Sequence, residues 1–540
     1  MTTKMKNKTL YIAGILALSI QISTLRAQEV ADKSFYSFER IELKTPWLTS
    51  ENGAGLVFNK VKDFSTVGGY FTNQSGDYTN YNDPQVYESF GLSTKSYMKV
   101  KKFYFYGSFG YDYGVRQNQS WLGTIYPNTA LNPICDSVPG KVLREDYFLA
   151  AKIGYKVNDK YSLGVAFDYH TATGAKRKDG RNSNVFSDFS VRPGVTFNSK
   201  YFTLGLNANY SHSVERVEYK YLGDVTGKSL YYFEPFFFYT ESGINSSSTY
   251  KRGYFSDIFG GALQVELKLG ELAFYNQLQV NYTRENDFED NNLLKRYATI
   301  DGLKYKYNGV AKYSTKFVDH IVNLRFISDE TFSYNVINNY ERVPGENNVW
   351  AYFEYGKDLR YIQTSKNYGA EYNAYLKKSE WLIDWTFSAG FNYFEIDKQY
   401  KVYPAKYEQN YNLSEVYGSV AKSVMTSDLS KLDLSVGYGY TFGKGDMLKT
   451  QNPLTTGALK QNEKLLYADF MYNTANKYRF SFASKFTYAV EPKSGKSVYA
   501  AFKATHIQLP QAPIRDGIIF SQYSGGANRG YYEFSFGFNF

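Results

Sequence analysis

The 540-residue sequence has one cysteine, 13 prolines and four histidines, and no apolar run long enough to cross a bilayer as a helix. One cysteine cannot pair within its own chain, which excludes a disulfide-stabilised scaffold. A mean hydropathy of −0.47 excludes a bundle of membrane-spanning helices. Aromatic residues, by contrast, make up 19% of the chain. Because disordered chains are poor in aromatic residues, we expect a folded protein.

Residues 1–27 have the pattern of a secretory signal peptide. Lys4, Lys6 and Lys8 precede an apolar segment, residues 10–22, that is too short to span a bilayer. We expect cleavage after Ala27, and no cysteine follows to carry a lipid anchor. Removal of this basic segment lowers the net charge of +10, so the mature chain is only mildly basic. We therefore expect no nucleic-acid partner, because such binding needs a concentrated basic face.

From residue 64 to the end, apolar and polar residues alternate with the period of two that is typical of β-strands. In residues 161–170 the apolar positions are Tyr161, Leu163, Val165, Phe167 and Tyr169. Residues 147–157 repeat the pattern, and a short connection that contains Asn158 and Asp159 separates the two segments, as in a hairpin turn. The layout recurs around residues 270–271 and in residues 381–393, where Trp381 begins the apolar face.

The connections alternate in length. Short turns are predicted near residues 100, 158, 199, 270, 329 and 379, and longer links at 117–143, 221–253, 286–302 and 398–413. Such alternation is typical of an up-and-down transmembrane barrel. A soluble sandwich or propeller also alternates, but its strands average about five or six residues. We predict an all-β fold, a transmembrane antiparallel barrel over residues 64–540, with an even number of about 18 strands (about 14–20).

The polar faces of these segments are too hydrophilic for a dry core, so we expect them to line a lumen. The lumen-facing candidates are Lys152, Lys156, Asp168, His170, Gln264, Glu266, Lys268, Asp384, Arg479 and Lys485. Lysines and acids share these walls, so the sequence does not indicate the charge of the solute.

The last residues, GYYEFSFGFNF, alternate strictly and end on an aromatic side chain. This pattern resembles the terminal β-signal of bacterial outer-membrane proteins, which the barrel-assembly machinery recognises. The resemblance assigns that role to Phe536, Phe538 and Phe540. With the signal peptide it predicts insertion into the outer membrane of a Gram-negative bacterium, among lipid and lipopolysaccharide.

Residues 28–63 are too few for the globular plug of TonB-dependent transporters. The segment WLTSENGAGL, residues 47–56, resembles the short N-terminal hatch of the fatty-acid-transporter family, in which an Asn-x-Ala-Gly-like turn lies inside the lumen. Gly53 stands where that family has proline. The resemblance implies a lumen plug or hatch that contains Trp47, Asn52, Gly53, Ala54 and Gly55. An ordinary glycine-rich turn leading into the barrel is the alternative.

The sequence offers no catalytic, metal or cofactor motif. Its histidines are scattered, and no H-x-x-H pair or cysteine cluster is present. We interpret His170 beside Asp168 as part of a polar wall and Cys135, between two prolines, as a solvated loop thiol. We therefore predict that the protein is not an enzyme.

Two loops carry features that bind ligands or partners in other proteins. One holds an aromatic cluster, Tyr231, Tyr232, Phe233, Phe236, Phe237, Phe238 and Tyr239. This cluster is a binding surface, a loop folded into the lumen or a self-packed cap over the mouth. The other, residues 173–181, is a basic tip that contacts lipopolysaccharide or is simply solvated.

These features together predict a porin-like outer-membrane channel or transporter for an unidentified solute. The N-terminal segment and the long extracellular loops would restrict its lumen. The alternative is an accessory barrel that transports nothing and docks a surface lipoprotein or a TonB-dependent receptor.

Overall fold

The computed structural model describes residues 35–61, 63–126, 130–178, 180–226, 228–245, 248–289, 294–379, 381–454, 459–492, 494–510, 514–515, 518–519 and 527–540. The expected signal peptide, residues 1–27, lies outside the described residues, as do residues 28–34 of the N-terminal segment. Within the described part, every helix is too short or too polar to cross a membrane.

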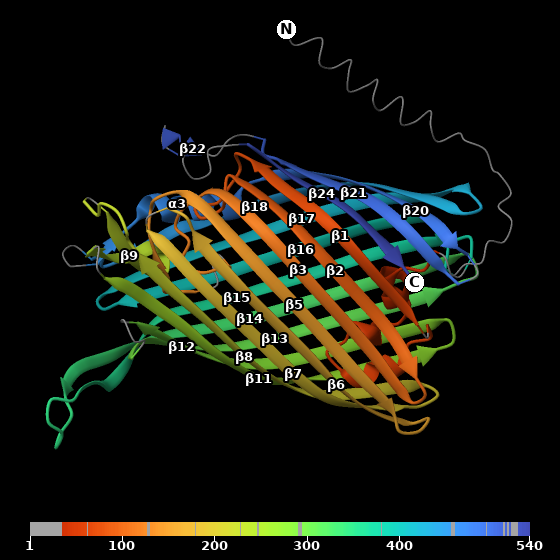
Figure 1. Cartoon of the computed structure of the whole chain (residues 1–540), viewed down its shortest axis with the longest axis horizontal. Coiled ribbons are helices and arrows are strands. Elements are labelled where there is room, and N and C mark those ends of the chain that lie inside the picture. Colours follow the sequence, from red (N-terminus) through yellow and green to blue (C-terminus); the bar gives the residue numbers. More distant parts are fainter. Residues whose placement is uncertain are drawn as a thin grey trace, which may run out of the picture.

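Eighteen strands of the described chain form one antiparallel sheet that closes on itself (Figure 1). Closure is made by the first and last strands, whose register runs from Thr66 opposite Asn539 to Gly76 opposite Arg529. In chain order the strands are β1 (Phe64–Gly76), β2 (Val86–Val100), β3 (Phe103–Gln119), β5 (Gly140–Lys156), β6 (Tyr161–Lys176), β7 (Arg181–Asn198), β8 (Phe202–Lys220), β11 (Thr249–Leu269), β12 (Leu272–Glu289), β13 (Lys295–Ser314), β14 (Val318–Arg342), β15 (Trp350–Lys377), β16 (Ile383–Val402), β17 (Ala405–Ser427), β18 (Ser430–Gln451), β20 (Lys477–Glu491), β21 (Lys496–Gln508) and β24 (Asn528–Asn539). The predicted barrel and its strand number are confirmed.

The remaining elements are short. Before the barrel come α2 (Phe38–Lys44), η3 (Pro46–Leu48) and η4 (Gly53–Phe58). Helix α2 begins at Ser37, whose hydroxyl accepts a hydrogen bond from the Arg40 amide at 3.2 Å, a common N-cap. The connections hold β4 (Ile134–Cys135), β9 (Ser229–Glu234), η5 (Pro235–Phe237), β10 (Phe238–Gly243), β19 (Lys460–Gln461), α3 (Glu463–Thr474), β22 (Ile514–Arg515) and β23 (Ile518–Ile519).

The outer face of the sheet is apolar. At one level of neighbouring strands, Leu92 is 47% exposed and Phe536 is 53% exposed, while Gly69 lies between them. An apolar band of this extent is unfavourable in water, and a closed sheet leaves no unpaired backbone edge in lipid. The protein is therefore an outer-membrane β-barrel, with the outer face in contact with lipid.

Three predicted connections are wrong. The predicted turn near residue 329 lies inside β14, and the turn is at residues 315–317. Asp329 continues the strand because it pairs with Lys304 across the sheet. Within the expected links 286–302 and 398–413, β12 continues to Glu289 and β13 begins at Lys295, while β16 continues to Val402 and β17 begins at Ala405. Strands such as β12 and β14, with 18 and 25 residues, are longer than the roughly 9–11 residues that span a bilayer, so their ends can carry polar residues on both faces. Most of residues 510–523 lies outside the described part.

Candidate functional site: a lumen with two closures

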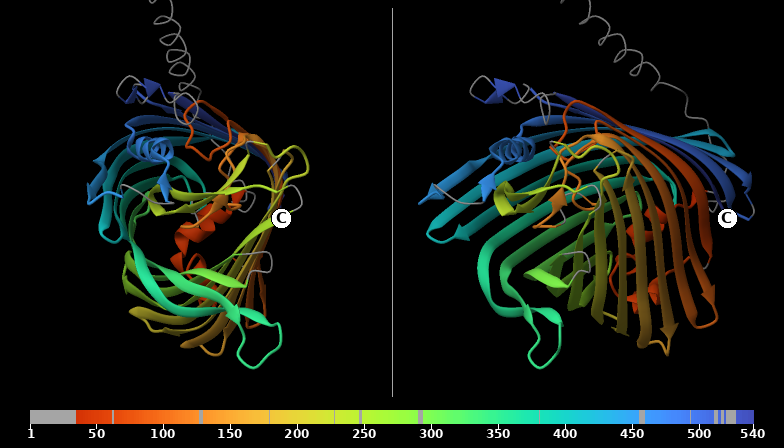
Figure 2. Two further views of the ribbon diagram at one scale, coloured as in Figure 1. Left: turned by 90° about the vertical axis from the view of Figure 1, so that its left-hand side faces the viewer. Right: turned by 60° about the vertical axis from the view of Figure 1, so that its left-hand side comes forward.

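Residues 35–61, here named the lumen segment, lie inside the barrel at the end with short turns (Figure 2, left). Four of the predicted hatch residues, Asn52, Gly53, Ala54 and Gly55, are buried at the start of η4. The fifth, Trp47, is buried in η3. The structure therefore brings all five together against the wall.

A row of three glycines in the barrel wall leaves the space in which η4 packs. Gly154, Gly164 and Gly194 are direct cross-strand neighbours on β5, β6 and β7. A Cβ atom on Gly164 would lie 2.1 Å from the amide nitrogen of Ala54, and one on Gly194 would lie 2.3 Å from Oδ1 of Asn52. Real Cβ atoms do not approach this closely, so the row, here named the glycine groove, has room for η4 only because side chains are absent.

Asn52 fastens the segment to the strands beside this groove. Its Nδ2 donates hydrogen bonds to the carbonyl oxygens of Val195 and Leu206, at 3.0 and 3.2 Å, and to Oε1 of Gln264 at 3.1 Å. Its Oδ1 accepts from the Ala54 amide at 3.0 Å. Each polar atom of this fully buried side chain is satisfied, which makes burial of the amide tolerable.

Trp47 makes a second polar attachment. Its Nε1 donates to Oε2 of Glu266 at 2.8 Å. Its ring packs edge-on against Tyr275, with centroids 5.3 Å apart, and against Phe58 at 5.2 Å. Gly205 leaves room for the ring, since a Cβ atom there would lie 2.7 Å from it.

Ion pairs and charged donors complete the attachment. Arg40 pairs with Asp319 of β14 at 2.7 Å, and that carboxylate also pairs with Lys377 at 2.7 Å. Glu51 pairs with Arg192 of β7 at 3.2 Å. Lys152 of β5 donates to the carbonyl oxygens of residues 48 and 50, each at 2.9 Å. The segment is thus held to the wall largely by polar contacts.

A different closure lies at the opposite end, where the long connections gather, as at the extracellular end of outer-membrane barrels (Figure 2). Strands β9 and β10 form a hairpin that extends into a small sheet with β4 and β19, and α3 packs beside it. We name this assembly the outer cap. The predicted aromatic residues provide its core: Phe236 and Phe238 pack on Tyr361, Tyr400 and Tyr407 of the wall. The aromatic loop is therefore folded into the barrel mouth.

The outer cap also buries the cysteine. Cys135 is 2% exposed and packs with Trp121, Phe233 and Leu465, so the interpretation as a solvated thiol is wrong. Desolvation by burial raises the pKa of the Cys135 thiol well above its ordinary value, which makes it unreactive. The proline and polar residues around Cys135 suggested that its side chain is exposed. Cys135 is buried because β4, which contains it, pairs with β9 of a distant loop.

The pairing register places nine of the ten lumen-facing candidates on the inward side of the sheet, whereas Asp384 lies at a bulge at the start of β16, outside the register. Lys152, Gln264, Glu266 and Lys268 lie around the lumen segment, the last with its ammonium 5.8 Å from the Phe58 ring. The others are dispersed along the wall: Lys156 pairs with Asp159 at the rim, Asp168 with Arg192, Asp384 with Lys422, Arg479 with Glu415, and Lys485 lies over the Tyr499 ring.

His170 and Asp168 do not form a pair. The imidazole Nε2 of His170 lies 2.5 Å from the Tyr126 hydroxyl and 3.2 Å from Asp146, and its ring stacks on Phe148. His170 is thus part of a wall-to-loop contact. Among the described residues, no cluster of three or more histidine, cysteine, aspartate or glutamate side chains is arranged to hold a metal.

A polar cavity of about 520 Å³ lies against the lumen wall formed by β13–β17 and β20. Its charged lining residues are Arg325, Glu371, Glu415 and Arg479, and Arg479 pairs with Glu415 at 2.7 Å. Both signs of charge face the space, together with asparagine side chains. Such a surface can hold a polar solute and water, and it has no wide apolar stretch for an acyl chain.

The sequence did not predict several residues that hold the lumen segment in place. Trp381, predicted on the lipid-facing side, lies in the turn before β16 and packs on Tyr36 at 4.4 Å and beneath the Lys44 ammonium at 3.7 Å. A turn residue is not bound to the alternation of the strand that follows, so the period-two pattern does not apply to it. Arg40 and Asp319 are separated by 279 positions, and no local signal connects them.

The glycine groove gives a first prediction. Gly164→Ala should displace η4, because its Cβ atom would clash with the backbone of Ala54, and overpacking costs about 1–3 kcal/mol. We expect trypsin to cut the folded barrel after Arg40 or Lys44 about tenfold faster. Gly302→Ala is the matched control, because its nearest neighbour lies 3.5 Å from the new Cβ atom. Equal cleavage rates in the two variants would show that the groove does not hold η4.

Comparison with known proteins gives a family without an assigned role. The model of the "Family of unknown function (DUF6850)" matches residues 53–540. No curated protein matches the sequence.

Solved structures with similarity to this fold include a copper transporter, a peptide importer and a receptor. The copper transporter OprC is 9% identical, with 88% of this chain and 80% of that chain covered and a TM-score of 0.38. The RagAB peptide importer in its "closed-closed" state is 8% identical, with 89% and 87% covered and a TM-score of 0.40. The ferric preacinetobactin receptor BauA of Acinetobacter baumannii is 11% identical, with 88% and 79% covered and a TM-score of 0.39.

Proposed function

Because the chain belongs to a family of unknown function (DUF6850), we propose a function from its own lumen: an outer-membrane transporter for a polar solute, with the lumen segment as its hatch. One observation carries this proposal. A polar interior lies between an inner segment and an outer cap that are both built from the chain itself. Such an interior is suited to holding a solute between two closures.

The contacts of the lumen segment support its role as a movable part. Its attachments by Asn52, Trp47 and Arg40 are hydrogen bonds and ion pairs, which water can replace when the segment leaves. Polar interfaces of this kind are typical of parts that move relative to one another. An apolar cluster that includes Ile41, Leu48 and Leu56 adds stability to the closed position.

The nature of the lumen restricts the solute class. Residues 47–56 resemble the hatch of fatty-acid transporters, and the buried position of Asn52 in the lumen supports a hatch role for them. However, the charged lining of Arg325, Glu371 and Glu415 favours a polar or zwitterionic solute over an acyl chain. We therefore propose that residues 47–56 act as a hatch, as the resemblance implies, but that the solute is not a fatty acid.

Access to the lumen provides the test. In a Cys135→Ser background, Asn323→Cys places a thiol in the lumen cavity. A membrane-impermeant maleimide should label it slowly in the full chain and about tenfold or more faster in a variant that lacks residues 35–61. Tyr403→Cys is the control, because Tyr403 is 97% exposed and should react equally in both backgrounds. Heat-modifiable gel mobility confirms that the deleted barrel is folded. Equal labelling of the lumen thiol in both backgrounds would refute the hatch.

The accessory role is a second candidate, supported by the hairpin of β14 and β15. This hairpin projects beyond the barrel mouth (Figures 1 and 2). Its tip exposes aromatic side chains, among them Tyr340 and Trp350, which stack at 5.7 Å. Exposed aromatic surface outside the bilayer is typical of protein contacts, here with a surface lipoprotein or a TonB-dependent receptor. This hypothesis predicts that the thiol of Asn323→Cys stays shielded without residues 35–61 and that the barrel does not conduct even when the outer cap is removed as well.

A further inference from the structure

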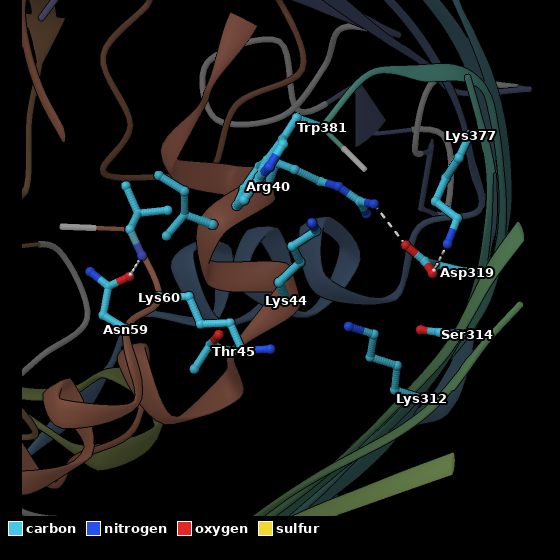
Figure 3. Close-up of a pocket in the computed structure, with 12 residues that line it drawn as sticks. Arg40, Lys44, Thr45, Asn59, Lys60, Lys312, Ser314, Asp319, Lys377 and Trp381 are labelled. Atoms are coloured by element: carbon cyan, nitrogen blue, oxygen red, sulfur yellow. Dashed lines mark hydrogen bonds and ion pairs between the residues drawn. The ribbon is translucent and has the colours of Figure 1, made fainter. Parts of the chain in front are cut away.

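A cavity of about 210 Å³ lies at the inner end of the barrel, between the lumen segment and the wall (Figure 3). Five cationic residues line it: Arg40, Lys44, Lys60, Lys312 and Lys377. Asp319 is the one carboxylate among the described residues that line the cavity. The lining therefore carries four more positive than negative charges, which is a strong excess for so small a space.

Asp319 is already held by its neighbours. Its Oδ2 accepts from Arg40 at 2.7 Å, its Oδ1 accepts from Lys377 at 2.7 Å, and the Ser314 side chain is also hydrogen-bonded to it. The carboxylate is 3% exposed, so these contacts fix its position at one side of the cavity. It cannot at the same time neutralise Lys60 and Lys312, which enter from other sides.

Those lysines point into the open space. Figure 3 shows the ammonium groups of Lys60 and Lys312 directed into the cavity from the lumen segment and from β13. Lys44 enters from α2, and its ammonium lies 3.7 Å from the centre of the Trp381 ring. Two like charges 4 Å apart repel by about 1 kcal/mol in bulk water and about 4 kcal/mol near a protein surface. An anion in the cavity would replace this repulsion by attraction.

We propose that this cavity binds a small oxyanion of the phosphate class. Lysine is a phosphate ligand that acts as a point charge, and the two ammonium groups of Lys60 and Lys312, directed into one space, match the several acceptor oxygens of a dianion. The Thr45 side chain lines the same space and can donate a hydrogen bond. At about 30 Å³ for each water molecule, the cavity has room for an oxyanion with part of its hydration shell.

Both partners of the closure contribute to this site. Arg40, Lys44 and Lys60 belong to the lumen segment, and Lys312 and Lys377 belong to the wall. An anion bound between them joins the segment to the wall, so by linkage it favours the closed position. This consequence rests on the proposed hatch, whereas the binding site itself does not.

Binding of inorganic phosphate to the detergent-solubilised mature protein provides the test. Calorimetric titration should show one saturable site, and Lys60→Gln/Lys312→Gln should weaken its affinity about tenfold or more. Lys160→Gln/Lys200→Gln is the matched control, because it removes the same charge at the turns that follow β5 and β7, outside the cavity. The control should leave the affinity within about twofold of the full chain. The proposed site would be refuted if phosphate showed no saturable binding at millimolar concentration. It would also be refuted if Lys60→Gln/Lys312→Gln, here named the cavity variant, bound phosphate with the affinity of the full chain.

Two further measurements identify the source of the oxyanion and test its effect on the lumen segment. Dihexanoyl phosphatidic acid, titrated in parallel, tests a lipid headgroup against free phosphate, and tighter binding of either one that the cavity variant loses supports the site. Phosphate should also slow maleimide labelling of Asn323→Cys in the full chain and leave the cavity variant unchanged. If phosphate binds but labelling does not respond, the link to the hatch is wrong while the site stands.

Discussion

Removing both closures at once should turn a closed barrel into an open pore, with single-channel conductance at least about tenfold above that of the full chain. The variant lacks residues 35–61 and carries a short Gly-Ser linker in place of residues 229–243, which include β9, η5 and β10. The two closures lie in series along one lumen. Removal of either one alone leaves the other in place, so each single variant should remain close to the closed baseline.

Planar-bilayer recordings of the full chain, both single variants and the double variant check this prediction. Shortening of residues 343–349, at the tip of the projecting hairpin, is the control, because those residues lie outside the lumen and should not change conductance. A double variant that stays closed would favour the accessory barrel. A single variant that conducts fully would show that only one closure blocks the lumen.

The second large effect concerns the lipid-facing surface. Leu92→Arg places a charge on the outer face near the middle of β2, where arginine costs about 2–4 kcal/mol in a bilayer. The folding equilibrium in liposomes should shift by about 30-fold or more, and little of the variant should reach the outer membrane.

The neighbouring residue provides the control. Ser93 lies on the inward side of the same strand and is exposed to the lumen. Ser93→Arg adds the same side chain at the same depth and should change the folding equilibrium by less than about 1 kcal/mol. Similar destabilisation by both substitutions would contradict the assignment of the outer face to lipid.

The sequence was sufficient for the barrel because lipid and water impose opposite requirements on alternate residues of a strand. Where a strand leaves the bilayer, both faces meet water and the alternation disappears. Asp329 therefore suggested a turn, although it continues β14 through its pair with Lys304. The strands thus extended further than the pattern indicated, while their number and pairing order followed from it.

The site was predictable only in part. The family resemblance pointed to Asn52 and its neighbours, but their partners are Val195, Leu206 and Gln264, more than a hundred positions away. The burial of Cys135 and the inward turn of Trp381 also depend on contacts with distant loops. Single-sequence periodicity describes which face a residue occupies, and it contains no information on what fills the space beyond that face.

The glycine groove ties two distant stretches of the gene into one unit of selection. A side chain at Gly164 would overlap the backbone of residues 53 and 54, and a side chain at Gly53 would overlap the backbone of Val165. A substitution at either position is therefore tolerated only where the other stretch has changed as well, so we expect the two stretches to vary together among related chains.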